Sequence, residues 1–163
     1  MLLLLRSVLA AAVLPGTVTL LIPWLIVSRS GTAPLRDWGA VQALALVPIV
    51  IGVSILVRCI YEFAARGRGT LAPVDPPKHL VVSGLYRYVR NPMYLGALIM
   101  LLGEAALFRS TTILVFAAVW FLLVNLFVLF YEEPILRRRF GESYDRYRGA
   151  VHRWLPGKPY EGS

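Results

Sequence analysis

Hydrophobic residues lie along the chain in four long runs, each close to the length of a helix that crosses a bilayer. The runs are residues 8–27, 38–57, 92–108 and 111–131. About 20 apolar residues suffice to span the hydrocarbon core, so the pattern predicts an all-α, polytopic membrane protein with about four transmembrane helices. Residues 108–111 leave room only for a tight turn, which predicts that the third and fourth runs form a helical hairpin.

The ends of these runs differ in charge, which gives an expected orientation. Three of the 17 Lys and Arg residues, Arg29, Arg36 and Arg109, fall in the first and third connections, and 17 − 3 = 14 fall elsewhere. The positive-inside rule then places both termini in the cytoplasm. The N-terminus resembles a signal peptide, but its apolar run continues to Val27 and a basic n-region is nearly absent, so we expect an uncleaved first span.

The connection between the second and third runs is rich in Gly and Pro, which favours an ordered loop over a helix. It ends at Arg90-Asn91-Pro92. Asn is a good N-cap and Pro fits the first turn, so these residues predict the start of a helix.

The C-terminal part carries a different periodicity. Leu136, Phe140, Tyr144 and Tyr147 recur at spacings of four, four and three residues, with arginines and acids between them. This spacing predicts an amphipathic helix lying on the cytoplasmic membrane surface. The run Arg137–Arg139 is expected to bind lipid headgroups.

Composition agrees with the membrane class. Of 163 residues, 58% are hydrophobic and 16% are charged, which predicts a single membrane domain, 1–163, with two N-terminal spans in 1–63 and the remaining elements in 64–163. The net charge of +8 comes mostly from arginines beside apolar runs, so membrane lipids explain it better than nucleic acid does. One cysteine and two histidines exclude an internal disulfide and a multi-His metal site.

Several polar motifs at the ends of the apolar runs resemble the isoprenylcysteine carboxyl methyltransferase family, within a wider group that includes phospholipid N-methyltransferases. The resemblance covers about residues 66–154 and leaves the first two runs outside. Its motifs are Lys78-His79-Leu80-Val81, Ser83-Gly84, Tyr86, Arg90-Asn91-Pro92-Met93-Tyr94-Leu95-Gly96, Glu132-Glu133, Phe140-Gly141 and Tyr144–Tyr147.

The resemblance implies a multi-pass enzyme, in the inner membrane if the source is bacterial, that binds S-adenosylmethionine at the cytoplasmic face and releases S-adenosylhomocysteine. It implies a lipophilic or small methyl acceptor, and it leaves the oligomeric state open. Arg90 and Glu133 are its candidate catalytic residues. Its candidate cofactor-binding residues are Lys78, His79, Leu80, Val81, Tyr86, Asn91, Pro92, Met93, Tyr94 and Glu132.

The residue types suit this cofactor. Its ammonium group needs a carboxylate, which Glu132 or Glu133 offers at the end of the fourth run. Its carboxylate needs N–H donors or a cation, and a helix that starts at Asn91 with Arg90 beside it supplies both. The chain offers neither a βαβ pattern nor a GxGxxG motif, so a Rossmann site is not expected.

The acceptor stays open at this stage. Family members that methylate prenylcysteine carry an arginine shortly before the Glu pair, and residues 125–131 contain no cation. Phospholipid-type relatives also use Asn-Pro, as Asn91-Pro92 does, so a phosphatidylethanolamine N-methyltransferase is one alternative. A non-catalytic membrane scaffold with the same fold is another, in which Arg90 is a membrane anchor and the Glu pair only ends a span.

Two polar residues inside the apolar runs have simpler interpretations. Glu104 lies in the third run, where an acid is a functional candidate by default, but its nearness to Arg109 favours an ion pair at the far interface. Asn125 in the fourth run is expected to bond another helix.

Overall fold

The computed structural model describes residues 15–30, 38–62, 80 and 82–162, and all regular structure in these ranges is helical, which confirms the all-α prediction. The elements are the π-helical turn η1 (Thr17–Leu21), α2 (Ile22–Arg29), α3 (Ala40–Glu62), the 3-10 turn η3 (Gly84–Arg87), α4 (Pro92–Leu107), α5 (Thr111–Phe127), the π-helical turn η4 (Val128–Glu132), α6 (Glu133–Phe140) and α7 (Glu142–Ala150).

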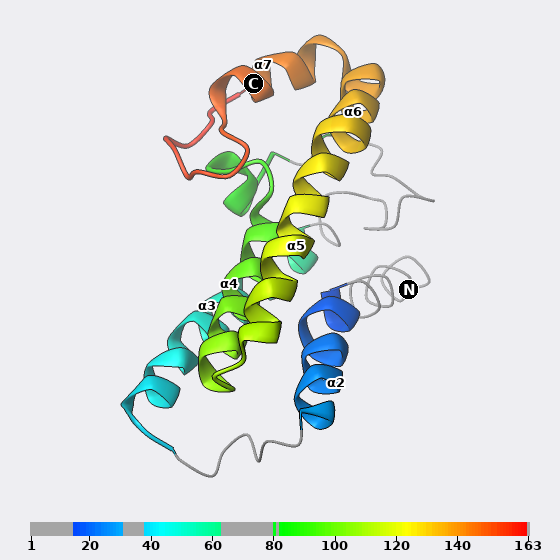
Figure 1. Ribbon diagram of the computed structural model, residues 1–163. Helices are drawn as coiled ribbons and strands as arrows, with labels where there is room; N and C mark the ends of the chain where they lie inside the picture. The colour runs from blue at the N-terminus through cyan, green and yellow to red at the C-terminus, as the bar shows by residue number, and fades with distance from the viewer. Residues whose placement is uncertain (1–14, 31–37, 63–79, 81, 163) are drawn as a thin grey trace, which may run out of the picture.

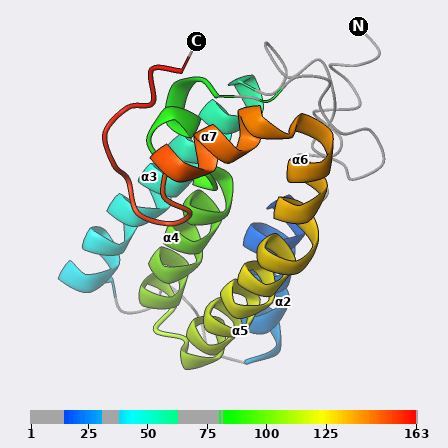
Figure 2. The same cartoon turned by 90° about the horizontal axis from the view of Figure 1, so that it is seen from above.

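The long helices stand side by side. Helix α4 packs between α3 and α5, and α2 lies on the other side of α5 (Figure 1). Helix α6 continues the direction of α5 through η4, and α7 turns across the end of the bundle (Figure 2). The last residues of the chain then return toward η3 and the start of α4.

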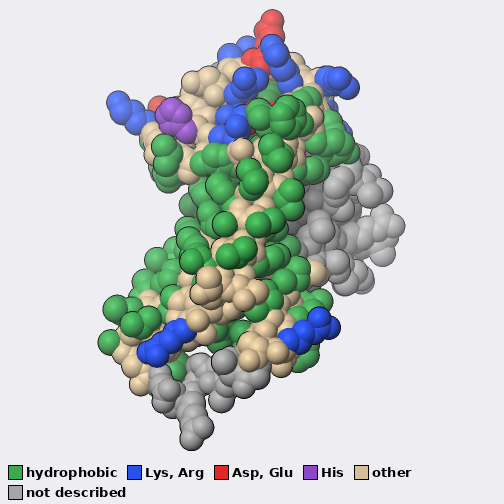
Figure 3. All heavy atoms as spheres, in the orientation of Figure 1, with side chains coloured by type: hydrophobic (Ala, Val, Ile, Leu, Met, Phe, Trp, Pro, Cys, Tyr) green, Lys and Arg blue, Asp and Glu red, His purple; other side chains and the backbone are tan. Residues whose placement is uncertain are grey.

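Within the described ranges, two helices are long and apolar enough to cross a membrane. They are Ala40–Glu62, with a mean hydropathy of 2.5, and the continuous helix Thr111–Phe140, with a mean hydropathy of 2.8. Thr17–Arg29 and Pro92–Leu107 are shorter apolar helices, so a count of four spans stays a prediction. Hydrophobic side chains cover the middle of the molecule, and Lys and Arg gather at its two ends, most densely around α6 and α7 (Figure 3).

A seam of glycines brings α3 and α4 close together. A Cβ added at Gly52 would lie 2.6 Å from the carbonyl oxygen of Gly96, and one added at Gly103 would lie 2.7 Å from the Ile49 side chain. Small residues allow this backbone approach, which is a common way for helices to associate in membranes. The seam fixes the position of α4, whose first turn forms part of the site.

The predicted hairpin is confirmed. Helix α4 ends at Leu107 and α5 begins at Thr111, where the Ser110 hydroxyl accepts a hydrogen bond from the Ile113 N–H at 3.3 Å. The expected Glu104–Arg109 pair is wrong. The Arg109 guanidinium donates to the Gln42 side chain of α3 at 3.5 Å, and Glu104 Oε2 is buried without a partner among the described residues.

The single amphipathic helix predicted at the C-terminus is also wrong. Gly141, with φ 53° and ψ −130°, separates α6 from α7. Tyr144 and Tyr147 of α7 are buried with Val151 against other parts of the protein, including Leu80. The buried part of the apolar face therefore packs on the segment before α4, because the turn at Gly141 folds it back over the bundle. Its placement at the membrane surface stays a prediction.

Candidate functional site

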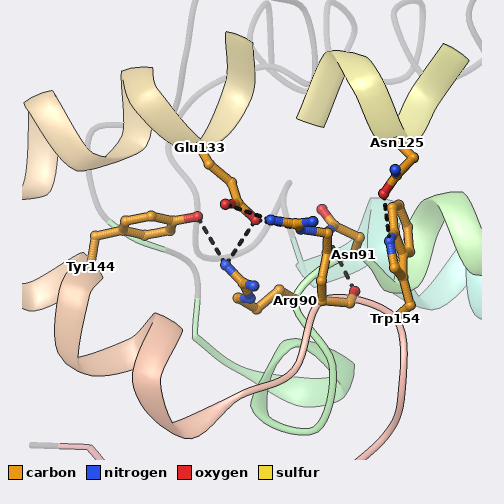
Figure 4. A network of polar contacts seen from close by, with 7 residues as sticks. Arg90, Asn91, Asn125, Glu133, Tyr144 and Trp154 are labelled. Atoms are coloured by element: carbon orange, nitrogen blue, oxygen red, sulfur yellow. Dashed lines mark hydrogen bonds and ion pairs between the residues drawn. The ribbon is translucent and has the colours of Figure 1, made fainter. Parts of the chain in front are cut away.

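Three chain segments that are far apart in sequence meet where the helices end. They are residues 90–94 at the start of α4, the Glu132-Glu133 junction between η4 and α6, and the C-terminal segment 151–160. Figure 4 shows the polar contacts that join them. The predicted proximity of the Arg90–Tyr94 region and the Glu pair is present in the structure.

Glu133 is the centre of this network and is held by two arginines. Its Oε1 accepts from Arg90 Nη1 at 2.9 Å and from Arg153 Nε at 2.7 Å, and its Oε2 accepts from Arg153 Nη2 at 2.9 Å. The carboxylate is 6% exposed, and its hydrogen bonds raise the pKa of Arg153. A buried charge needs such partners, so Glu133 is already neutralised within the protein.

Arg90 has a buried donor that its contacts with Glu133 and Tyr144 do not use. Its Nη1 also lies 3.4 Å from the Tyr144 hydroxyl, whose pKa is raised by burial and then by Glu133, so this hydroxyl stays neutral. Arg90 Nε is buried and has no hydrogen-bond partner in the part of the chain that the structure describes. An unsatisfied buried N–H is costly in a folded protein, and this one would be satisfied by an anionic ligand.

Glu132 lies in a different environment from its neighbour. It is the last residue of the π-helical turn η4, a feature often found at functional sites. Its Oε2 accepts from the Tyr94 hydroxyl at 3.2 Å, and no cation pairs with it in the described part of the chain. Tyr94 itself lies edge-on to Trp120 of α5. Glu132 is thus the carboxylate of the pair that can receive a cationic group.

The first turn of α4 presents backbone donors to the same region. The helix begins at Pro92 as predicted, but the Asn91 side chain does not cap it and donates instead to the Arg153 carbonyl oxygen at 3.4 Å. The Leu95 N–H bonds to the Asn91 carbonyl, while Met93 and Tyr94 lie in the first turn, where N–H groups lack acceptors within the helix.

The remaining predicted site residues lie farther from this network or outside the described residues. Leu80 packs against the Tyr144–Tyr147 cluster. Tyr86 is buried beside Cys59, burial raises its pKa, and its carbonyl accepts from the Tyr147 hydroxyl at 2.6 Å. The predictions for Lys78, His79 and Val81 fall outside the described residues.

Sequence reasoning missed the contribution of the C-terminal segment. The Arg90 N–H donates to the His152 carbonyl, and the Gly157 N–H donates to the Tyr88 carbonyl, both at 2.9 Å. Arg153 bonds Glu133, and Trp154 Nε1 donates to Asn125 Oδ1 at 2.9 Å. Asn125 therefore bonds this segment and not another helix. The sequence offers one signal for this segment, a cation beside an aromatic residue after the last helix. A single pair has no periodicity, so it does not point to α5.

Buried Glu62 is a second residue that the sequence did not single out. It ends α3, five residues beyond the predicted run, and accepts from the Ser83 hydroxyl at 2.7 Å. Gly84 follows with φ +55°, and a Cβ there would lie 2.6 Å from the Glu62 carboxylate. This contact fixes the loop that leads to Arg90.

The fold and this site define a helical integral membrane protein with a charged site where its helices end. The chain belongs to the phospholipid methyltransferase family, whose family model matches residues 40–143. The match includes α3 and so reaches further toward the N-terminus than the motifs alone, which begin near residue 66.

Similar proteins agree with this family. A probable protein-S-isoprenylcysteine O-methyltransferase of Oryza sativa subsp. indica is 28% identical over 125 residues, which is 75% of this chain and 64% of the relative. A protein-S-isoprenylcysteine O-methyltransferase of Schizosaccharomyces pombe is 35% identical over 79 residues, 47% of this chain and 33% of the relative. An uncharacterized Haemophilus influenzae protein is 33% identical over 63 residues, 39% of this chain and all of the relative.

The matched region thus spans less than two thirds of the rice and yeast proteins. No solved structure matches the chain.

Proposed function

We propose that the protein is a membrane methyltransferase that transfers a methyl group from S-adenosylmethionine to a lipophilic acceptor at the cytoplasmic membrane face. The observation that carries the proposal is the division of the glutamate pair. Glu133 is neutralised by Arg90 and Arg153, whereas Glu132 accepts from the Tyr94 hydroxyl, has no cationic partner among the described residues, and stands beside the first turn of α4. An amino-acid moiety, with one ammonium and one carboxylate group, fits this arrangement.

Each half of that moiety has a partner. Glu132 would accept from the ammonium, with Tyr94 holding its carboxylate in place. Arg90 Nε and the free N–H groups of the first turn of α4 would donate to the carboxylate. Glu133 would then act by holding the Arg90 guanidinium, so Arg90 contacts the cofactor and Glu133 positions it.

When bound, S-adenosylmethionine supplies a methyl group on a positively charged sulfur. Transfer of that methyl is an in-line displacement, which depends on alignment and on the exclusion of water. The rigid seam between α3 and α4 and the network around Glu133 would provide the alignment. An apolar acceptor would reach the site laterally from the bilayer, with both termini in the cytoplasm and four spans in the membrane.

The relatives' names suggest an isoprenylcysteine as the acceptor. The family description favours a phospholipid as a second candidate. The absence of a cation in residues 125–131 also favours the phospholipid. Incubation with labelled S-adenosylmethionine and either phosphatidylethanolamine or an S-farnesylcysteine derivative separates the two by the labelled product.

Calorimetric titration of S-adenosylhomocysteine into the protein in nanodiscs tests the cofactor site. Glu132→Gln is expected to weaken binding about 10- to 150-fold, because a charge-assisted hydrogen bond is worth about 1.5–3 kcal/mol. Glu142→Gln, an exposed carboxylate of α7 paired with Arg146 at 3.6 Å, is the matched control and should bind as the wild type does.

Failure of the wild-type protein to bind, in nanodiscs and in detergent alike, would contradict the proposal and favour the scaffold alternative. Equal affinity in Glu132→Gln and the wild type would contradict the assignment of Glu132 alone.

A further inference from the structure

The segment after α7 forms a loop whose two ends are fixed beside the site. His152 accepts from the Arg90 N–H at one end, and the Gly157 N–H donates to Tyr88 at the other. Between them, Arg153, Trp154 and Leu155 form the tip. Arg153 bonds Glu133, so the position of the tip is coupled directly to the carboxylate beside Glu132.

Trp154 carries this tip onto the membrane-spanning helix α5. Its Nε1 donates to Asn125 Oδ1 at 2.9 Å, and its ring lies edge-on to Phe121 with 4.9 Å between ring centroids (Figure 4 shows Asn125 and Trp154). Asn125 and Phe121 precede Glu132 by seven and eleven residues, which is about 10 and 16 Å along a helix. The indole therefore lies closer to the middle of the bilayer than the Glu132 carboxylate does.

The chemistry of the tip suits an apolar neighbour. Leu155 is 72% exposed, although Arg153 on one side and Gly157 on the other are hydrogen-bonded to the protein. The indole N–H is satisfied by Asn125, so the rest of the ring is an apolar surface with its polar end occupied. Trp residues favour such positions at the edge of a bilayer.

We propose that Trp154 is a specificity-determining residue, whose ring forms the bilayer-side wall of the site and contacts the apolar chain of the methyl acceptor, and that Asn125 positions this ring. The inference rests on the proposed function. An acceptor whose reactive group lies near Glu132 and Tyr94 must direct its chain along α5 into the lipid. On that path, Trp154 is an aromatic side chain placed between the charged network and the bilayer.

The first test locates the ring independently of any reaction. In a protein with Trp24, Trp38 and Trp120 changed to Phe, Trp154 is the only tryptophan. Its emission is recorded in vesicles of phosphatidylcholine with bromines at set depths of the acyl chain. Strong quenching by acyl-chain bromines is expected. Emission equal to that in unbrominated vesicles would place the ring away from the acyl chains and overturn the inference.

The second test separates acceptor binding from cofactor binding. N-acetyl-S-farnesylcysteine and phosphatidylethanolamine serve as acceptor probes, and the probe that is methylated is used. Trp154→Ala is expected to raise the acceptor KM about tenfold, the effect of losing a contact of about 1.4 kcal/mol, with kcat and S-adenosylhomocysteine affinity nearly unchanged. Trp154→Phe and Asn125→Leu should raise the acceptor KM less than Trp154→Ala does. Trp38 is an exposed tryptophan before α3, and Trp38→Ala is the control.

Different failures have different meanings. A wild-type protein that binds no S-adenosylhomocysteine and methylates neither probe contradicts the proposed function. An active protein with an unchanged acceptor KM in Trp154→Ala contradicts this inference alone. Loss of cofactor affinity in proportion to the loss of acceptor affinity would show that Trp154 only supports the fold, and would overturn the inference as well.

Discussion

Removal of the Glu133 charge is expected to destabilise the protein strongly. The change Glu133→Gln keeps the size of the side chain and removes its negative charge. Arg90 and Arg153 would then face each other without the carboxylate that holds them. Because the Arg90 side chain is only 10% exposed, water cannot replace the lost partner.

The expected magnitude follows from the geometry. Loss of one partner of a buried ion pair costs about 3–5 kcal/mol. Arg153 is 24% exposed and regains part of its hydration, so we expect about 3 kcal/mol, at the lower end. For a domain of this size, 1 kcal/mol shifts the Tm by about 2–4 °C, so the Tm should fall by about 6–12 °C. The Glu142 carboxylate is 94% exposed, and Glu142→Gln should change the stability by less than about 0.5 kcal/mol.

Thermal unfolding in nanodiscs, followed by tryptophan fluorescence, measures both variants under the same conditions. A double-mutant cycle of Glu133→Gln with Arg153→Gln should give a coupling energy of at least about 1 kcal/mol, because the two side chains share two short hydrogen bonds. Equal Tm values for Glu133→Gln and Glu142→Gln would refute the reasoning, and additive effects in the cycle would refute the pairing of Glu133 with Arg153.

Two further predictions concern backbone contacts. Gly52→Ala should lower the Tm by several degrees, since its Cβ would lie 2.6 Å from the Gly96 carbonyl oxygen. The control Gly149→Ala in α7 has open space and should leave the Tm equal or higher. Equal melting curves for Gly52→Ala and the wild type would show that α3 and α4 separate without cost. Gly84→Ala should lower both the Tm and the affinity for S-adenosylhomocysteine, because φ is +55° and the added Cβ would meet Glu62. An affinity in this variant equal to that of the wild type would show that the loop does not position Arg90.

Local sequence signals predicted the elements that support the site. A proline after a polar residue marked the start of α4 at Pro92, and the short polar interval 108–111 marked the turn into α5. These features depend on residues close together in the chain, such as the fixed φ of proline and the length of an apolar run. The start of α4 and the turn into α5 were therefore accessible from the sequence.

Partners across the fold were not accessible in the same way. The spacing of Leu136, Phe140, Tyr144 and Tyr147 indicated one apolar face, but periodicity does not say what that face covers, and the turn at Gly141 directs it onto the protein. Likewise, a basic residue after the last helix gave no sign that Arg153 would bond Glu133. Such contacts join segments 20 residues apart or more, and the packing of α4 against α3 and α5 decides them.

The adjacency of Glu132 and Glu133 shows why two neighbouring carboxylates need not share a role. Consecutive residues of a helix point about 100° apart, so one carboxylate meets Arg90 and Arg153 while the other meets Tyr94. The two arginines and two glutamates sum to zero charge. The amino-acid part of the cofactor, without the positively charged sulfur, also has zero net charge, so its binding between Glu132 and the first turn of α4 would pair both of its charges and avoid the cost of burying an unpaired one.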